Sequence, residues 1–481
     1  MAVKTGDLES ELIEGVRDRV RERLPPGQVA MVDSFVRQYY HWVPPADLAG
    51  RSEEDLYGSA LAQWRLTLER HPHQTKVRVY NPEEGDGFQS PFTIVEIVSD
   101  DMPFIVDSVT MELARQGCPI NLLIHPVMRI RRDEQGRLLD VLEPDAPAGA
   151  VPAESILHAE VAREHDQARL RALVRGLERT VDDVTAAVGD WQAMRIRMLE
   201  LANQVADAPG PVGLEEVEEV QAFLRWVADD HFVLLGYREY ELTDDGHGKA
   251  LQARPETGLG LLATPPTQPV KPLAPRAVEL AEAPHLLVLT KTNAVSPVHR
   301  PVRMDYIGIK RFGPDGRVQG EYRFLGLYTT SAYRAAPRTI PIVRGKVDYI
   351  LSRAAFPPDS HDAKALLEIL ESHPRDALFQ VSAGDLFEIA MGLLGLGERP
   401  RVRLFVWRDA LERFVSCLVT IPRDRFNTEN RERIGRILLE AFHGDQLDFS
   451  LQLSESLLVR VHYIVRCAGG VSADPDIGAL E

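Results

Sequence analysis

The sequence predicts an α+β protein of several domains, in which antiparallel sheets pack against helices. Strand-like runs rich in β-branched and aromatic residues recur along the chain, as in Phe92–Val98. Amphipathic stretches with apolar residues at helical spacing lie between them, and Thr428–Phe442 is the clearest example. Short turn sequences such as Gly313–Gly316 join neighbouring strands, which favours antiparallel hairpins. A chain of 481 residues has room for roughly three to four such domains.

The stretch Phe92–Arg132 is the most informative part of the chain. After its opening strand, Asp100 or Asp101 can cap a helix, and Pro103 falls in the first helical turn, where its missing N–H costs nothing. Gly117 suits the left-handed residue that ends a helix. The buried stripe of this helix is expected at Ile105, Val106, Val109 and Leu113.

The same periodicities define the other elements. Glu143–Ala153 is expected to be a loop, Asp244–Gly248 a turn and the proline-rich Arg254–Pro275 a long surface loop, whereas Ala473–Glu481 shows neither a cap nor a packing element. Helices are predicted within Asp7–Tyr40 and at Leu56–Leu68, Arg163–Val188, Ala193–Val205, Leu214–Val227, Asp362–Glu371, Asp385–Leu394 and Thr428–Phe442, the last ended by Gly444. Further strands are predicted at Ile120–Arg131, Arg137–Leu142, Ser155–Val161, His231–Glu241, His285–Lys291, Met304–Arg311, Glu321–Leu327, Val343–Asp348, Val402–Trp407, Phe414–Pro422, Leu447–Leu453 and Leu457–Val465.

Several long phrases resemble the amino-terminal region of the large NAD-dependent glutamate dehydrogenases. They are SDDMPFIVDSVTMEL followed by IHPVMRIRR, HFVLLGYREYEL (231–242), DYIGIKRF with RFLGLYTTSAY (305–333), and FVSCLVTIPRDRFNTENRERI (414–434). The resemblance covers nearly the whole chain. It implies ACT-like βα sandwiches, a PAS-type antiparallel sheet and a separate catalytic region that is not within these residues.

The resemblance and the spacing of the elements together give expected domain borders. They are an N-terminal helical region at 1–75, an ACT-like domain at 76–190, a helical connector at 191–230, a PAS-type sheet domain at 231–350, a helical linker at 351–400, a second ACT-like domain at 401–470 and a tail at 471–481 that leads to the catalytic region.

Composition narrows the class of protein. The net charge of −17 argues against nucleic-acid binding, which needs clustered Lys and Arg. No apolar run approaches the ~20 residues that span a bilayer, and the first residues have no signal-peptide core. Cys118, Cys417 and Cys467 are odd in number and far apart, which fits a reducing compartment. We therefore expect a cytoplasmic protein without membrane or nucleic-acid partners.

The sequence offers little for dinucleotide chemistry. A pyrophosphate-binding turn follows a strand and opens a helix, whereas the glycines at 392, 395 and 397 follow a helix and are expected to end it. Gly258-Leu259-Gly260 lacks the third glycine, and no Lys-Gly-Gly segment occurs. We expect no bound NAD, no other cofactor and no catalytic residue in this segment.

Other candidate sites have simpler explanations. Asp229, Asp230 and His231 fit a helix-to-strand junction better than a metal site, and no HExxH helix or close cysteine pair occurs. His158 and Glu160 could meet a ligand on one strand face, although a satisfied polar pair is favoured. Ser108 has no nucleophile elbow around it. The arginines of 129–137 are expected to form a solvated hairpin or an intersubunit salt-bridge patch.

One turn remains as a candidate effector site. The resemblance to ACT domains implies that the turn after the first strand receives an amino-acid carboxylate. Asp101 and Pro103 match the Asp-x-Pro-Gly-like pattern of that turn, but Phe104 replaces the glycine that allows close approach. In the alternative interpretation, Asp101 caps the helix and Phe104 anchors the core. The candidate effector-binding residues are Asp100, Asp101, Met102, Pro103, Phe104 and Asp107.

The functional hypothesis is a regulatory and oligomerisation segment. The resemblance implies a parent enzyme, a homotetramer, that oxidises L-glutamate to 2-oxoglutarate and ammonia with NAD, and an amino acid or other metabolite as effector. Two alternatives stay open: a free-standing ACT-type amino-acid sensor, and an enzyme in its own right with an unrecognised site.

Overall fold

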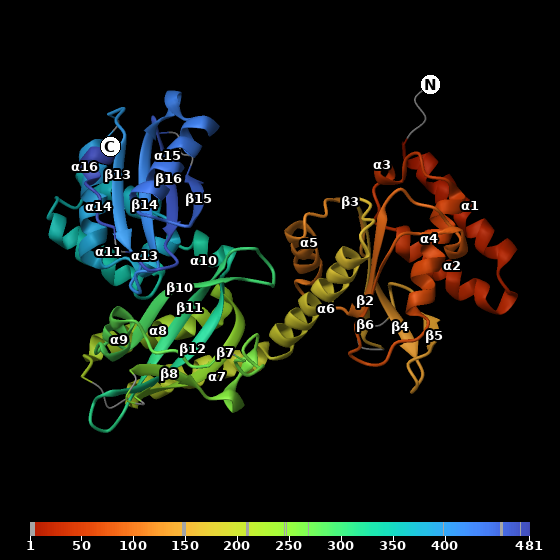
Figure 1. The fold of residues 1–481 in the computed structure, drawn as a ribbon, viewed down its shortest axis with the longest axis horizontal. Coiled ribbons are helices and arrows are strands. Elements are labelled where there is room, and N and C mark those ends of the chain that lie inside the picture. Colours follow the sequence, from red (N-terminus) through yellow and green to blue (C-terminus); the bar gives the residue numbers. More distant parts are fainter. Residues whose placement is uncertain are drawn as a thin grey trace. The chain divides into compact units, whose positions relative to one another are not determined.

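The computed structural model describes residues 5–146, 151–207, 211–244, 246, 248–267, 269–397, 399–452, 456–471 and 473–481. The chain forms two compact units: Met1–Gly189 with Val295–Val302, and Asp190–Ala294 with Arg303–Glu481. Both combine helices with antiparallel sheets, which confirms the predicted α+β class (Figure 1). Parts of the expected loop Glu143–Ala153, turn Asp244–Gly248 and strand Leu447–Leu453 lie outside the described residues.

The first unit is a three-layer sandwich around one antiparallel sheet. The strand order is β1-β2-β6-β4-β5, and β3 pairs with β6 beside β4. Its strands are β1 (Lys76–Tyr80), β2 (Thr93–Asp100), β3 (Ile120–Ile124), β4 (Val127–Arg132), β5 (Leu138–Val141) and β6 (Ala153–Val161). Its helices are α1 (Thr5–Arg23), α2 (Pro26–Tyr40), α3 (Pro45–Leu48), α4 (Glu53–Thr67), η1 (Glu84–Asp86), α5 (Ile105–Arg115) and α6 (Gln167–Gly189).

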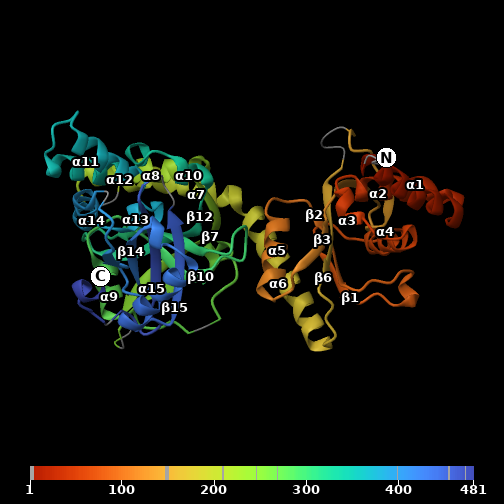
Figure 2. The same ribbon diagram turned by 90° about the horizontal axis from the view of Figure 1, so that it is seen from above.

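Alternation along the strands divides the core of this unit into two layers. Val95 and Ile97 of β2 pack with α5 and α6, whereas Val98 faces the opposite side and packs with α1, α2 and α4. The helices accordingly cover both faces of the sheet (Figure 2). The predicted apolar stripe of α5 is confirmed, because Ile105, Val109 and Leu113 are buried.

The second unit contains a central sheet of order β10-β11-β12-β7-β8, with β9 paired to β7. Its core face packs on α7 and α8 through Ile307, Ile309 and Phe324. The elements of this part are α7 (Trp191–Gln204), η2 (Val205–Asp207), α8 (Leu214–Trp226), a π-helical turn η3 (Val227–His231), β7 (Phe232–Asp244), β8 (Lys249–Ala253), η4 (Pro255–Thr257), β9 (Leu259–Gly260), α9 (Pro275–Glu282), β10 (Leu287–Val295), β11 (Arg303–Phe312) and β12 (Val318–Tyr328).

A helical segment and a second sheet complete this unit. The sheet has the order β13-β14-β16-β15, and α15 packs on it to give the expected ββαββ arrangement. The helices before it are α10 (Thr330–Arg334), η5 (Pro337–Thr339), α11 (Val343–Ala354), α12 (His361–Glu371), α13 (Arg375–Gln380) and α14 (Ala383–Leu396). The rest are β13 (Arg403–Arg408), β14 (Phe414–Pro422), η6 (Arg423–Arg425), α15 (Thr428–Ala441), β15 (Gln446–Gln452), β16 (Leu458–Arg466) and α16 (Ile477–Leu480).

Several expectations about strands and loops were wrong. The strand predicted at Ile120–Arg131 is two strands, β3 and β4, because His125-Pro126 interrupts it. Val343–Asp348 begins helix α11, in which Val343, Val347 and Ile350 form a buried helical stripe. The loop expected at Arg254–Pro275 contains η4 and β9. The polar tail ends in α16, which the Asp476 side chain caps.

Helix ends also differ from expectation. Neither Asp100 nor Asp101 caps α5; the capping position is Phe104, in the left-handed region at φ 71°, and Pro103 precedes the helix. Gly117 (φ 74°) follows the helix in the left-handed region, as predicted. After α15 the left-handed residue is His443 (φ 53°), not Gly444. Ile437 is an apolar residue of this predicted amphipathic helix, but it is 41% exposed.

Candidate functional site

The predicted effector turn is held by contacts within the first unit. The carboxylate of Asp100 is bound by Arg70 and, at 2.8 Å, by Nδ1 of His73. Burial opposes its ionisation, but these hydrogen bonds outweigh burial and lower the pKa of Asp100. The backbone N–H of Asp101 donates to the carbonyl of Ala153 at 3.0 Å. This end of the turn is therefore hydrogen-bonded to the sheet, because Ala153 is the first residue of β6.

The other end of the turn contacts the segment Val295–Val302, which belongs to the same unit. The rings of Phe104 and His299 lie 4.7 Å apart, and the backbone N–H of His299 donates to Oγ of Ser108 at 3.1 Å. Nδ1 of His299 lies 3.3 Å from Oδ2 of Asp107. Met102 is half-buried, whereas Asp101 and Pro103 are exposed. The structure thus separates the six predicted residues: Phe104 and Asp107 meet at His299, and Asp100 points to Arg70.

A polar cavity of about 460 Å³ lies elsewhere in the first unit. Arg51, which follows α3, donates from Nη1 and Nη2 to the two carboxylate oxygens of Glu160 on β6, at 2.5 and 2.7 Å. Burial opposes ionisation of Glu160, but hydrogen bonds and the charge of Arg51 lower its pKa to about 2. The expectation of a satisfied polar pair is confirmed for Glu160 but not for His158, whose buried ring nitrogens have no hydrogen-bond partner among the described residues and whose Nε2 lies 4.0 Å from Oε1 of Glu160. The main partner of Glu160 comes from 109 residues away, so no local pattern could have named it.

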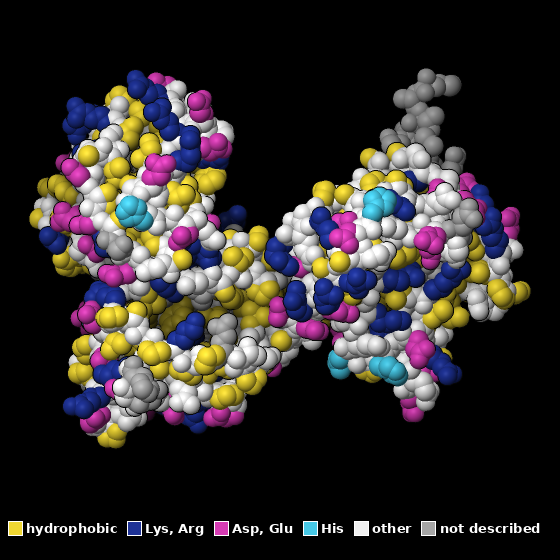
Figure 3. Space-filling model, viewed as in Figure 1, with side chains coloured by type: hydrophobic (Ala, Val, Ile, Leu, Met, Phe, Trp, Pro, Cys, Tyr) yellow, Lys and Arg dark blue, Asp and Glu magenta, His cyan; other side chains and the backbone are white. Residues whose placement is uncertain are grey.

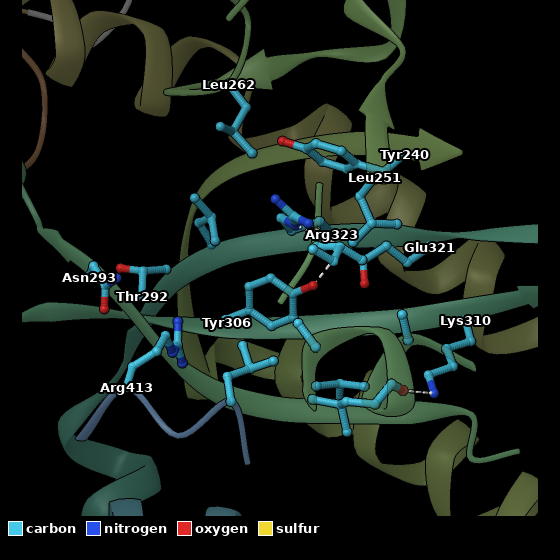
Figure 4. Close-up of a pocket in the computed structure, with 17 residues that line it drawn as sticks. Tyr240, Leu251, Leu262, Thr292, Asn293, Tyr306, Lys310, Glu321, Arg323 and Arg413 are labelled. Carbon is cyan, nitrogen blue, oxygen red and sulfur yellow. Dashed lines mark hydrogen bonds and ion pairs between the residues drawn. The ribbon is translucent and has the colours of Figure 1, made fainter. Parts of the chain in front are cut away.

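A further candidate site is a pocket of about 290 Å³ on the central sheet of the second unit (Figure 4). Tyr306 and Lys310 project from β11, and Glu321, Arg323 and Leu325 from β12. These positions alternate with Ile307, Ile309 and Phe324, which are buried on the opposite, helix-covered face. The pocket is completed by Tyr240 (β7), Leu251 (β8), Leu262, Leu273, three residues of α9 (Ala277, Leu280 and Ala281), Val288, Thr292 and Asn293 (β10), and Leu411 and Arg413 from the β13–β14 turn.

Glu321 is the acceptor at the centre of this pocket. Its Oε1 accepts from the hydroxyl of Tyr306 and from Nε (2.9 Å) and Nη2 (2.5 Å) of Arg323. The guanidinium of Arg323 also lies 3.7 Å from the ring centroid of Tyr240. Burial raises the pKa of Tyr306, so its hydroxyl keeps its proton.

Two basic side chains stand at the edges of the pocket. Nζ of Lys310 donates to the carbonyls of Leu280 (2.5 Å) and Ala283 (2.6 Å), at the C-terminal end of α9. Burial lowers the pKa of Lys310 to about 8. Arg413 pairs through Nε with Oδ2 of Asp409 at 2.8 Å. It also donates to the carbonyl of Lys291 at 2.6 Å, so it joins the β13–β14 turn to the central sheet.

A buried ion cluster lies between the central sheet and α13. Nζ of Lys291 is 2.7 Å from Oδ1 of Asp305 and 3.1 Å from Oδ2 of Asp376, whose Oδ1 accepts from the hydroxyl of Tyr333 at 2.8 Å. Burial raises the pKa of Asp305 to about 6, in spite of the lysine. At Asp376 burial has the same direction, but Lys291 and Tyr333 outweigh it and lower the pKa.

The remaining candidates have structural partners. Arg132 binds both carboxylate oxygens of Glu154 at 2.6 and 2.7 Å, and Arg131 binds Asp140 at 2.9 Å, so these arginines of the basic stretch form ion pairs within the unit. Figure 3 shows Lys and Arg side chains gathered across the middle of the first unit, with some Asp and Glu side chains among them. Within the described ranges, no three His, Cys, Asp or Glu side chains are grouped as metal ligands. No helix in that part of the chain could cross a bilayer. The cysteines Cys118, Cys417 and Cys467 are free and buried.

Comparison with known proteins assigns three stretches to named domains. Residues 35–177 match the glutamate dehydrogenase ACT1 domain, residues 340–399 match helical motif 1 of the same enzymes, and residues 403–481 match their ACT2 domain. Together with the sheets described above, these matches define an ACT-domain protein. The matched ranges leave out residues 178–339, which contain the central sheet and most of its pocket.

Relatives extend the match to almost the whole chain. NAD-specific glutamate dehydrogenase of Halomonas elongata is 36% identical over 477 residues, and that of Pseudomonas aeruginosa is 34% identical over 485. They cover 98% and 100% of this chain, which spans 30% of the length of each. The enzyme of Mycobacterium tuberculosis is 30% identical over 428 residues. The chain belongs to the large NAD-specific glutamate dehydrogenase family and corresponds to its amino-terminal region.

Proposed function

We propose that this chain is the regulatory and assembly portion of a cytoplasmic NAD-dependent glutamate dehydrogenase. The parent reaction converts L-glutamate, NAD and water to 2-oxoglutarate, ammonia and NADH. The observation that carries the proposal is the match of nearly the whole chain to enzymes of which it spans only 30%. The residues that bind NAD and transfer the hydride lie, on this proposal, in the part of the enzyme that this chain does not span.

The regulatory role rests on the ACT1 and ACT2 domains, on the polar cavity in the ACT1 range and on the pocket of the central sheet. Small-molecule sites in proteins are concave, with an apolar lining and a few convergent polar groups. The pocket on the central sheet has this composition, and we assign the sheet as the PAS-type module of the segment. The turn at Asp100–Asp107 remains a proposed effector contact, with His299 and Arg70 as its neighbours.

The assembly role rests on an open sheet edge. Within the part of the chain that the structure describes, strand β15 pairs with β16 alone, so its other edge carries backbone groups that a second strand could pair with. Phe449 and Leu451 on this strand are 46% and 40% exposed. Pairing of β15 edges between copies would contribute to the proposed homotetramer.

The test compares two purified proteins: the 481-residue chain, and the complete polypeptide of the gene that encodes it. NADH formation from L-glutamate and NAD is followed by absorbance, with D-glutamate as the control substrate. We expect glutamate-dependent NADH from the complete polypeptide and none from the 481-residue chain. NADH formation by the chain alone, or none from the complete polypeptide, would overturn the proposal.

A further inference from the structure

The central-sheet pocket holds more positive than negative charge. Three cationic side chains line it, Lys310, Arg323 and Arg413, against one carboxylate, Glu321. Arg323 is paired with Glu321, and Arg413 is paired with Asp409 behind the wall. Among the described residues no carboxylate lies within 4.0 Å of the Lys310 ammonium. Lys310 is therefore the cation of the pocket whose charge is not balanced by an ion pair.

Lys310 is also held in position to bind. An ammonium group has three N–H donors, and two of them are used by the carbonyls of Leu280 and Ala283. Those carbonyls fix the ammonium at the end of α9, beside the pocket (Figure 4). No acceptor for the third N–H occurs among the described residues. A hydrogen bond from it to a bound carboxylate would be charge-assisted, which is the stronger class.

The rest of the lining is mostly aliphatic. The side chains that share this character are Leu251, Leu262, Leu273, Ala277, Leu280, Ala281, Val288, Leu325 and Leu411. Arg238 fixes the wall that carries Leu262, because its Nη2 donates to the carbonyls of Leu262 and, at 2.6 Å, Thr264. A volume of about 290 Å³ is near the lower end of the range in which proteins hold small ligands. The space suits a molecule of amino-acid size with a branched aliphatic body.

We propose that this pocket binds a small monocarboxylate with an apolar body and without an ammonium group, with the carboxylate on Lys310. A free amino acid is disfavoured because its ammonium group would join three cations, and Arg323 already neutralises the carboxylate of Glu321. Burial of Lys310 makes its charge costly, and a bound carboxylate offsets that cost.

The position of the pocket gives the binding a regulatory consequence. Leu411 and Arg413 come from the turn between β13 and β14, within the range that matches the ACT2 domain. A ligand would therefore touch the central sheet and the ACT2 sheet together. This consequence rests on the proposed regulatory function, whereas binding to the 481-residue chain does not depend on any dehydrogenase activity.

The experiment is titration calorimetry of the 481-residue chain near neutral pH with three matched probes. They are 4-methylpentanoate, its neutral amide 4-methylpentanamide, and leucine, which adds an ammonium group to the same carbon skeleton. We expect the acid to bind, and the amide and leucine to bind roughly tenfold to a hundredfold more weakly, which corresponds to one charged interaction.

Variants locate the binding site. Lys310→Met removes the ammonium, and Ala281→Phe fills the pocket but keeps the charge; both should weaken 4-methylpentanoate binding by roughly tenfold or more. Lys346→Met is the matched control, since Lys346 is a half-buried lysine that also donates to carbonyls, those of Leu378, Phe379 and Val381, and it does not line this pocket. Its affinity should equal that of the unsubstituted chain.

Three outcomes would overturn the proposal: no heat with 4-methylpentanoate, equal binding of the amide or leucine, or unchanged affinity in folded Ala281→Phe. If Lys310→Met does not fold, as judged by circular dichroism, Ala281→Phe and the amide decide the question. Failure here leaves the proposed function standing, because glutamate-dependent NADH formation is measured independently.

Discussion

Replacing Lys291 by Met isolates the buried ion cluster of the second unit. Methionine keeps the length and apolar stem of the lysine but removes the ammonium that lies between Asp305 and Asp376. Removing one partner from a buried ion pair costs about 3–5 kcal/mol of unfolding free energy. Because two carboxylates share this lysine, we expect a loss in that range at about pH 8.

The loss of unfolding free energy in Lys291→Met should be larger at high pH than at low pH. The pKa of Asp305 is already raised to about 6 with the lysine present, and without it the pKa rises further. When the pKa of a carboxyl group is higher in the folded than in the unfolded state, the protein loses unfolding free energy as the pH rises from the unfolded-state pKa through the folded-state pKa. Each pKa unit by which removal of the lysine raises the pKa of Asp305 corresponds to about 1.4 kcal/mol, so the loss of unfolding free energy should be smaller at pH 5.5 than at pH 8.

Urea unfolding of the full chain, followed by circular dichroism, measures these differences. The double variant Lys291→Met with Asp305→Asn also removes the surplus carboxylate, so it should recover most of the stability and lose the pH dependence. A loss below about 1 kcal/mol at pH 8, an equal loss at both pH values, or a double variant no more stable than the single one would refute this account of the cluster.

Three further predictions use other contacts. Glu160→Gln should lower stability at neutral pH, and the difference should vanish as the pH falls toward 2, because the pKa of Glu160 is depressed in the folded chain; parallel melting curves down to pH 2 would contradict this. Gly260→Ala should destabilise the chain by more than ~2 kcal/mol in urea, because Gly260 has φ 59° and a Cβ would lie 2.3 Å from the carbonyl oxygen of Leu235; Gly345→Ala, with open space around it, is the control. Binding of 4-methylpentanoate should weaken above about pH 8 as Lys310 loses its proton, with Glu321 and Glu216 as the charged neighbours that favour the protonated form; a flat calorimetric profile from pH 7 to about 9.5 would exclude Lys310 as the carboxylate contact.

The sequence predicted local elements well where one periodicity dominated. The stripe of α5 and the ββαββ order of the ACT2 region followed from apolar spacing alone. Expectation failed where distant residues decide the conformation. Strand β9 forms because Gly260 pairs with Gly236, and its N–H donates to Oδ2 of Asp190, 70 residues away. The sequence of the proline-rich stretch contains no local pattern that predicts pairing with such distant residues.

The site was harder to predict than the fold. Tyr306 and Lys310 alternate with Ile307 and Ile309 along β11, a pattern that normally indicates a solvated sheet face. Only the structure places α9 over that face, and the residues of α9 lie next to the loop predicted as irregular. The turn at Asp100–Asp107 was noticed through a resemblance, but its partners Arg70 and His299 are distant in sequence.

The most direct test of a sensing role is the glutamate-dependent rate of NADH formation by the complete polypeptide, titrated with 4-methylpentanoate. The account predicts that the rate changes with a midpoint close to the dissociation constant measured on the 481-residue chain, and that 4-methylpentanamide has no effect at the same concentrations. A rate that stays constant while the pocket is saturated would contradict it.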